Sequence, residues 1–232
     1  MNYIIFKDKK SDDFKELLIS ELPPISKPKM RVETTTINGR DGDILESLGY
    51  ASYNKSIRIG LKLGYMPRLN EIIKYFSGKG KLICSNEPDK YYNAEIVEQV
   101  DYNRLVKFRE ATVKFHVQPY KYLLDEAPYI FNITNQSEVM VANAGLEISK
   151  PIITIYGTGT IELKINDRTI CVLNMNSEYI TIDAMEEEAY CNGILKNRQM
   201  QGDFPELNLG VNKISWVGSV SKIIIEPKSR WL

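Results

Sequence analysis

Asp203 lies in the segment GDFPELNLGVNKISW, where a carboxylate in a loop rich in Gly, Pro and Asn could act as a general acid. A turn explains the same residues without any chemistry. Gly202 and Pro205 would set the bend, Gly210 would allow a left-handed backbone, and the Asn212 side chain would bind backbone groups. We therefore predict that this segment only turns the chain. Phe204 and Leu207 are expected to face inward, and Ile214 and Trp216 are expected to enter a strand on the same face.

His116 is the only histidine of the chain, so any Ser-His-Asp or Cys-His nucleophile would depend on it. No G-x-S-x-G elbow accompanies it, and one histidine cannot build the usual multi-histidine metal site. The acidic run Glu186–Glu188 could supply the carboxylate pair of a glycosidase, but adjacent glutamates on one loop are usually a solvated turn. We predict that the chain is not an enzyme and has no catalytic residues.

Two other segments partly match ligand-binding motifs. Asn38–Glu46, NGRDGDILE, has the acids and glycines of a calcium loop, but no register fits the EF-hand pattern. Ser77–Leu82, SGKGKL, follows a predicted helix, whereas a phosphate-binding loop precedes one. The three cysteines are odd in number and lack CxxC spacing. We therefore predict no cofactor-binding and no metal-binding residues, and we expect Gly39 and Gly42 to serve a tight turn.

The composition argues against nucleic-acid recognition by charge. The chain of 232 residues has 30 Lys and Arg and 30 Asp and Glu, which gives a net charge of zero. Affinity for phosphate backbones comes from clustered cations, so any contact with DNA would be passive. The N-terminal apolar run ends at Lys7, too early for a signal peptide or a membrane span. We expect a soluble chain that is made in the cytoplasm.

The first part of the chain is predicted to be α+β, with several strands and one helix. Strand-like patterns occur in the Thr-rich run Arg31–Thr36, at Asn54–Leu63 and at Leu105–Val117. The helix is expected in MPRLNEIIKYFSGKG, with Pro67 in its first turn. The strands on either side of Asp101–Asn103 are expected to form a hairpin. The apolar stripe of the helix is predicted at i, i+3, i+4 and i+7: Leu69, Ile72, Ile73 and Phe76.

The later part of the chain reads as strands only, at the spacing of 8–12 residues that is typical of a β-sandwich. Turns are expected at Gly157–Gly159 and Asn166–Arg168. The change of pattern predicts two domains, residues 1–134 and residues 135–232, which meet between Asp125 and Gly145. The fold class is therefore mainly β, with an α+β N-terminal domain.

In their order and spacing, motifs along nearly the whole chain resemble those of the distal tail proteins of siphophages and related prophages, the Dit family. In the first domain they are SDDF, PPISKP, GRDG, LNEIIKYFSGKGKL, YYNAEI and VKFHVQPYKY. In the second domain they are KPIITIYGTGTIELKIN, YITIDA, GDFPELNLGVNKISW and IIIEPKSRWL.

The resemblance implies a structural protein of the virion tail tip, or baseplate. Its N-terminal domain would be a tail-tube-like β-sandwich with a flanking helix, and its C-terminal domain a galectin-like β-sandwich. Six copies would close into a hexameric ring that joins the tail tube to the tail-associated lysin or tip protein and anchors receptor-binding proteins. DNA would pass through the central channel without specific binding, and no membrane would be involved.

The resemblance to galectins concerns the fold only. Sugar-binding galectins use a His-x-Asn-x-Arg strand and a stacking Trp, whereas the second domain has no histidine, and Trp216 and Trp231 lie in other contexts. We expect no tight glycan binding by the chain alone. The alternative function is a carbohydrate-binding protein that recognises host cell-wall glycan through its C-terminal β-sandwich. An exposed aromatic platform would favour it, and the chain has 14 tyrosines.

Overall fold

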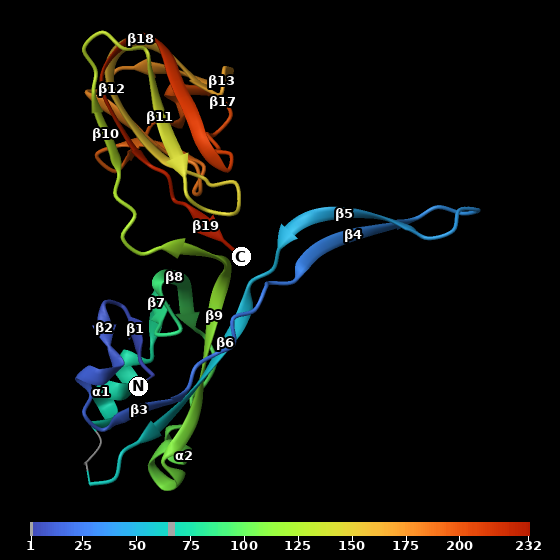
Figure 1. The fold of residues 1–232 in the computed structure, drawn as a ribbon, viewed down its shortest axis with the longest axis vertical. Coiled ribbons are helices and arrows are strands. Elements are labelled where there is room, and N and C mark those ends of the chain that lie inside the picture. The colour runs from blue at the N-terminus through green and yellow to red at the C-terminus, as the bar shows by residue number, and fades with distance from the viewer. Residues whose placement is uncertain (1, 65–67) are drawn as a thin grey trace. The chain divides into compact units, whose positions relative to one another are not determined.

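A computed structural model describes residues 2–64 and 68–232, and Figure 1 shows its fold as a ribbon. The chain divides into two compact units between Lys121 and Tyr122. Each unit has its own hydrophobic core. The division comes before the expected boundary at residue 134, because the strand Tyr129–Asn132 pairs with a strand of the second unit. The mainly β fold class that the sequence predicts is confirmed.

The first unit is built around one sheet with a helix on it. The strands of this sheet follow the order β2-β1-β7-β8-β9-β6-β3. The side chains of β6 and β9 alternate between buried and solvent-facing positions, which is the predicted strand pattern. The elements of the unit are β1 (Ile4–Phe6), β2 (Lys9–Lys10), a 3₁₀ turn (Ser11–Asp13), β3 (Leu17–Glu21), β4 (Met30–Thr36), β5 (Asp43–Tyr50), β6 (Tyr53–Leu61), α1 (Leu69–Tyr75), β7 (Gly78–Cys84), β8 (Glu87–Ile96), α2 (Tyr102–Phe108) and β9 (Glu110–Leu123).

Helix α1 forms where it is predicted, but it buries a different face. Ile72, Tyr75 and Phe76 are buried, while Ile73 is exposed. The buried positions follow the spacing i, i+3 and i+4, centred on Tyr75, whose hydroxyl donates to the backbone oxygen of Lys9 at 3.2 Å. The predicted stripe of Leu, Ile and Phe does not include Tyr75, which takes the central core position. Pro67 lies outside the described residues.

The hairpin predicted around Asp101–Asn103 is wrong, because helix α2 begins there. The Asp101 carboxylate accepts from the backbone N–H of Arg104 at 2.9 Å, which caps the helix. Leu105 is fully buried and attaches the helix to the core. The helix ends at Arg109, whose φ of 60° is left-handed. Strand β9 therefore starts only at Glu110.

Strands β4 and β5 form a separate two-stranded sheet, which we call the arm (Met30–Tyr50). In Figure 1 this hairpin projects from the sheet of the first unit. Its residues are exposed along both strands, apart from Tyr50 at the base. At its tip Gly39 and Gly42 have φ values of 83° and 79°, as a tight turn requires. The predicted strand and turn are thus present.

The second unit is a β-sandwich in which two long strands belong to both layers. The first half of β12 pairs with β14 and with the second half of β18. The second half of β12 pairs with β13 and with the first half of β18, which also pairs with β11. The core lies between the two layers. The elements of the unit are β10 (Tyr129–Asn132), β11 (Glu138–Asn143), β12 (Ile152–Ile165), β13 (Arg168–Met175), β14 (Tyr179–Asp183), β15 (Glu188–Cys191), β16 (Ile194–Leu195), a 3₁₀ turn (Asn197–Gln199), β17 (Met200–Gly202), β18 (Gly210–Glu226) and β19 (Arg230–Trp231).

The turn predicted at Gly157–Gly159 is wrong, since β12 continues through these residues. The register between β12 and β18 shifts there, so the strand bends from one layer into the other. A Cβ on Gly157 would lie 2.3 Å from the backbone oxygen of Ser219, so the bend needs glycine. The turn predicted at Asn166–Arg168 is present, with positive φ at Asn166 and Asp167. None of the described helices is long and apolar enough to cross a membrane.

Candidate functional site

The arm is the first candidate site, because it presents apolar side chains to solvent on both faces. Its register pairs Thr34 with Leu45 and Thr35 with Ile44. Paired residues share a face and neighbours alternate, so Leu45 and Ile44 point to opposite sides. Leu45 is 64% exposed and Ile44 is 42% exposed. Other exposed apolar residues of the arm are Met30, Val32, Ile37 and Leu48.

The arm has little to hold it in a single copy of the chain. An isolated two-stranded hairpin is marginally stable in water, and it becomes stable when an apolar face is packed against something. Among the described residues, β4 and β5 pair only with each other. At the base the Tyr50 ring meets the Tyr120 ring edge-on, at 6.1 Å between centroids. A hairpin with exposed apolar side chains on both faces is typical of an element that becomes buried in an interface with another chain.

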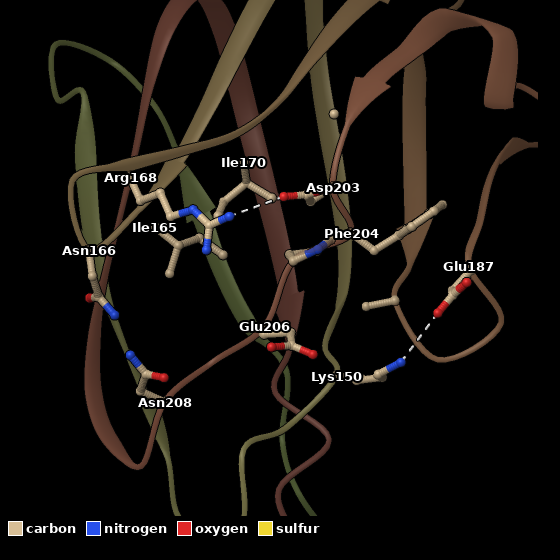
Figure 2. A pocket seen from close by; sticks show the side chains of 13 residues that line it. Lys150, Ile165, Asn166, Arg168, Ile170, Glu187, Asp203, Phe204, Glu206 and Asn208 are labelled. Carbon is tan, nitrogen blue, oxygen red and sulfur yellow. Dashed lines mark hydrogen bonds and ion pairs between the residues drawn. The ribbon is translucent and has the colours of Figure 1, made fainter. Parts of the chain in front are cut away.

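The second candidate is a cavity of about 660 Å³ in the second unit, shown in Figure 2. Two ion pairs lie in its wall, Arg168 with Asp203 at 3.2 Å and Lys150 with Glu187 at 3.4 Å. The side chains of Arg168 and Asp203 are largely exposed, so their attraction is screened by water. Phe204 forms part of the apolar wall. Asp203, the acid that the sequence singles out, thus makes a surface ion pair.

The loop around Asp203 is organised by a buried asparagine, as predicted. The Asn212 Oδ1 accepts from the Asn166 side-chain amide and from the Asn208 backbone N–H, both at 2.9 Å. Its Nδ2 donates to the backbone oxygens of Asn208 and Gly210 at 2.8 and 3.1 Å. Leu207 is fully buried, and Gly210 has a φ of 79°. Every polar group of Asn212 is used to hold the loop, which is a structural role.

The other residues that could do chemistry belong to different units of the chain. His116 is in the first unit, where its Nδ1 is 3.2 Å from Asn54 Oδ1. Glu186 and Glu187 belong to a turn whose backbone N–H groups at Met185 and Glu186 donate to the Asp183 carboxylate, and Glu188 begins β15. No three His, Cys, Asp or Glu side chains within residues 2–64 and 68–232 form a group that could hold a metal ion.

The cysteines are free and buried: Cys84, Cys171 and Cys191. Burial raises the pKa of Cys84 and of Cys171 to about 12, so neither thiol forms the reactive thiolate at neutral pH.

Two buried charged groups were missed by the sequence reasoning. Glu16 is buried and binds Arg68, and Lys55 occupies a core position of β6. The signal for Lys55 was its place two residues before Ile57, in the same row as Ile57 and Ile59. A lysine at a core position marks a buried polar contact.

Comparisons with known proteins agree with this architecture. Residues 8–117 match the family model described as the phage tail protein RIFT-related domain. No curated protein matches the sequence. Over 100% of both chains, the structure is similar to the SPP1 Dit protein (gp 19.1), with a TM-score of 0.72 and 15% identity. A chain of the activated phage P2 baseplate with Ca is similar at 10% identity and a TM-score of 0.54, over 97% of this chain and 96% of that one.

The family match concerns the first part of the chain: residues 8–117 match a phage tail protein domain. The fold along the whole chain is that of the SPP1 Dit protein, whose structure is described as a paradigm of hub adsorption apparatus. The resemblance to siphophage distal tail proteins that the sequence indicates is thereby confirmed. The same comparisons support a location at the virion tail tip.

Proposed function

We propose that six copies of the chain form a ring in the tail tip or baseplate. The ring joins the tail tube to the tip protein or tail-associated lysin and anchors receptor-binding proteins. The first unit forms the ring, and the second unit, a galectin-like sandwich, lies at its periphery. The chain has no catalytic role of its own. The fold shared with the SPP1 Dit protein, a hub protein, supports this assignment.

The observation that carries the proposal is the arm. Its apolar faces need a partner, and a second copy of the chain is the occupant that closes a ring, because each copy then both offers an arm and receives one. The arm also offers backbone N–H and C=O groups along its free edges, which a neighbouring strand can pair. Pairing would set the register, and burial of apolar side chains would supply most of the free energy.

Burial of the exposed apolar side chains of the arm contributes enough free energy to support association between copies. Burying the exposed half of a Leu or Ile side chain contributes about 1 kcal/mol, and the arm has several such residues. A permanent interface buries on the order of 2,000 Å² or more, so the arm must be joined by further surface of the first unit. If closure of the ring is marginal, dilute protein stays monomeric and assembles on the tube or the tip protein.

The central channel is expected to let DNA through without holding it. The chain has no net charge, and strong phosphate contacts require clustered cations. A wall without a dense cationic lining would let the duplex pass.

One observation favours the alternative, recognition of host cell-wall glycan by the second unit. The rings of Tyr156 and Tyr179 lie 5.1 Å apart on partly exposed positions of β12 and β14. Under this alternative, cell-wall polysaccharide would bind the chain, and Tyr156→Ala would abolish binding. We expect no tight binding, because the second unit lacks the histidine and the exposed Trp platform of sugar-binding galectins.

The ring is tested by light scattering and sedimentation over a concentration series, alone and with the tail tube protein and the lysin added. We expect Ile44→Thr with Leu45→Thr to weaken self-association at least tenfold, since threonine keeps the strand but removes apolar area. The matched control is Met140→Thr with Val217→Thr, two exposed apolar residues on strands of the second unit. A chain that stays monomeric with both partners present would refute the ring.

A further inference from the structure

The connector that leads into the arm is held by side chains of the first unit. This connector, Leu22–Lys29, has the sequence LPPISKPK and makes no strand of its own. Three of its backbone oxygens accept hydrogen bonds from side chains of β6 and of the turn between β7 and β8. Asn86 Nδ2 donates to Pro23 O at 3.2 Å, Lys55 Nζ donates to Pro24 O at 3.2 Å, and the Tyr53 hydroxyl donates to Ser26 O at 3.4 Å.

Lys55 is the unusual member of this set. It points to the buried face of β6, in the same row as Ile57 and Ile59, and is only 3% exposed. Its Nζ lies 4.6 Å from the centre of the Tyr92 ring, within the range of a cation–π contact. Burial lowers the pKa of Lys55, with the nearby Lys121 ammonium acting in the same direction. The cost of desolvating this ammonium opposes folding.

A second buried ammonium lies close to the first. Lys121 is 6% exposed, and its Nζ is 2.5 Å from Glu87 Oε1. The other oxygen of Glu87 accepts from the Tyr92 hydroxyl at 2.9 Å. Glu87 is thus the carboxylate that Lys121 and Tyr92 both use, while Lys55 turns to the connector.

Position 55 is a buried position of β6, in the same row as Ile57 and Ile59, where apolar residues are usual. Replacing a buried ion by an apolar residue of similar volume is often neutral or stabilising, and buried polar groups are kept in some proteins because they select one conformation. The conformation that Lys55 contacts is the connector, through Pro24 O. A methionine would fill the same space without that hydrogen bond.

We propose that Lys55 is a positioning residue that holds the connector against the sheet and thereby fixes the direction of the arm before a second copy binds. A fixed arm loses less conformational freedom on association, so it binds more tightly. Asn86 and Tyr53 hold the same connector on either side of Pro24. The effect on assembly rests on the proposed ring, whereas the effect on the arm does not.

The direction of the arm can be measured in the monomer with two spin labels. Glu46→Cys places one label on β5 and Glu95→Cys places the other on β8, both at exposed positions. The native cysteines are buried and should stay unlabelled. We expect a narrow distance distribution in the parent and a distribution at least twice as broad after Lys55→Met. Lys114→Met, a change at an exposed lysine of the neighbouring strand β9, is the matched control and should leave the distribution unchanged.

The distance distribution of the Lys55→Met variant tests the proposed role of Lys55. An unchanged distribution in Lys55→Met overturns it, and so does a Lys55→Met chain that fails to fold, because the lysine would then serve the core. Asn86→Ala provides a second reading, since it removes a neighbouring hydrogen bond without touching the core row, and it should also broaden the distribution. Lys55→Met should weaken self-association about tenfold or more. A broadened arm in a protein that never self-associates would refute the ring and keep the role of Lys55.

Discussion

Acid should weaken the first unit through one buried carboxylate, Glu16. Its Oε1 accepts from the Arg68 backbone N–H at 3.1 Å and from the Arg68 Nε at 3.0 Å. The Arg68 guanidinium is the main cause that lowers the pKa of Glu16 from 4.5 to about 2. Because Arg68 is the residue that precedes α1, the ion pair also holds the start of this helix.

The pKa shift of Glu16 gives the direction and the size of its contribution to the free energy of unfolding. The folded-state pKa is below the unfolded one, so the stabilisation is complete above pH 4.5 and is lost as the pH falls towards 2. A shift of this size corresponds to at most about 3 kcal/mol. The Arg68 side chain is 47% exposed, and water screens its charge, so we expect about 1–2 kcal/mol.

The perturbation is Glu16→Gln, which keeps the shape and removes the charge. Hydrogen exchange with mass spectrometry should show lower protection in the peptides of β9 and α1 at pH 7, after correction for the intrinsic exchange rate. The difference from the parent should shrink as the pH is lowered from 4.5 to 2.5. Hydrogen exchange gives an internal control, because the peptides of β12 and β13 lie in the second unit and should show no change.

Glu71→Gln is the matched control variant. Glu71 also binds Arg68, at 3.2 Å, but is 52% exposed, so its loss should change stability by no more than about 0.5 kcal/mol. Equal protection in Glu16→Gln and the parent at pH 7, or a difference that persists unchanged at pH 2.5, would refute the reasoning.

Two further predictions concern the loops. Asn212→Ala removes four hydrogen bonds from a fully buried site and should destabilise the second unit by about 2–4 kcal/mol in urea unfolding followed by tryptophan fluorescence. Asn208→Ala, which leaves the backbone contacts of this loop in place, should cost under about 1 kcal/mol, and equal losses would contradict the assignment. Gly39→Ala should cost the arm about 1 kcal/mol or more, because its φ is positive. Faster amide exchange at Thr36 would show this, and unchanged exchange there would remove the argument for the turn.

Local sequence determined much of this molecule. The alternation in β6 and β9, the turn glycines of the arm, and the positive φ at Asn166 each depend on residues within a few positions. The loop that ends at Asn212 was likewise predictable, because the Asn212 side chain binds backbone groups of Asn208 and Gly210, within four residues along the chain. The order of motifs pointed to distal tail proteins, which the comparisons confirm.

Other features were decided by distant parts of the chain. The Asp101 cap that begins α2 was readable, but the burial of Leu105 that holds the helix depends on β6 and β9. Gly157 reads as a turn residue, and only the close approach of Ser219 makes it a bend within a long strand.

Lys55 shows the same limit at the candidate site. Its sequence neighbours predict an ordinary strand, yet its environment comes from Pro24, Tyr92 and Lys121, which lie 31, 37 and 66 positions away along the chain. Likewise, the Thr-rich run of the arm predicts a strand but not that both of its faces stay uncovered. Backbone conformation depends on steric contacts between near neighbours, whereas burial depends on which distant strands pack together, so only the tertiary structure decided it.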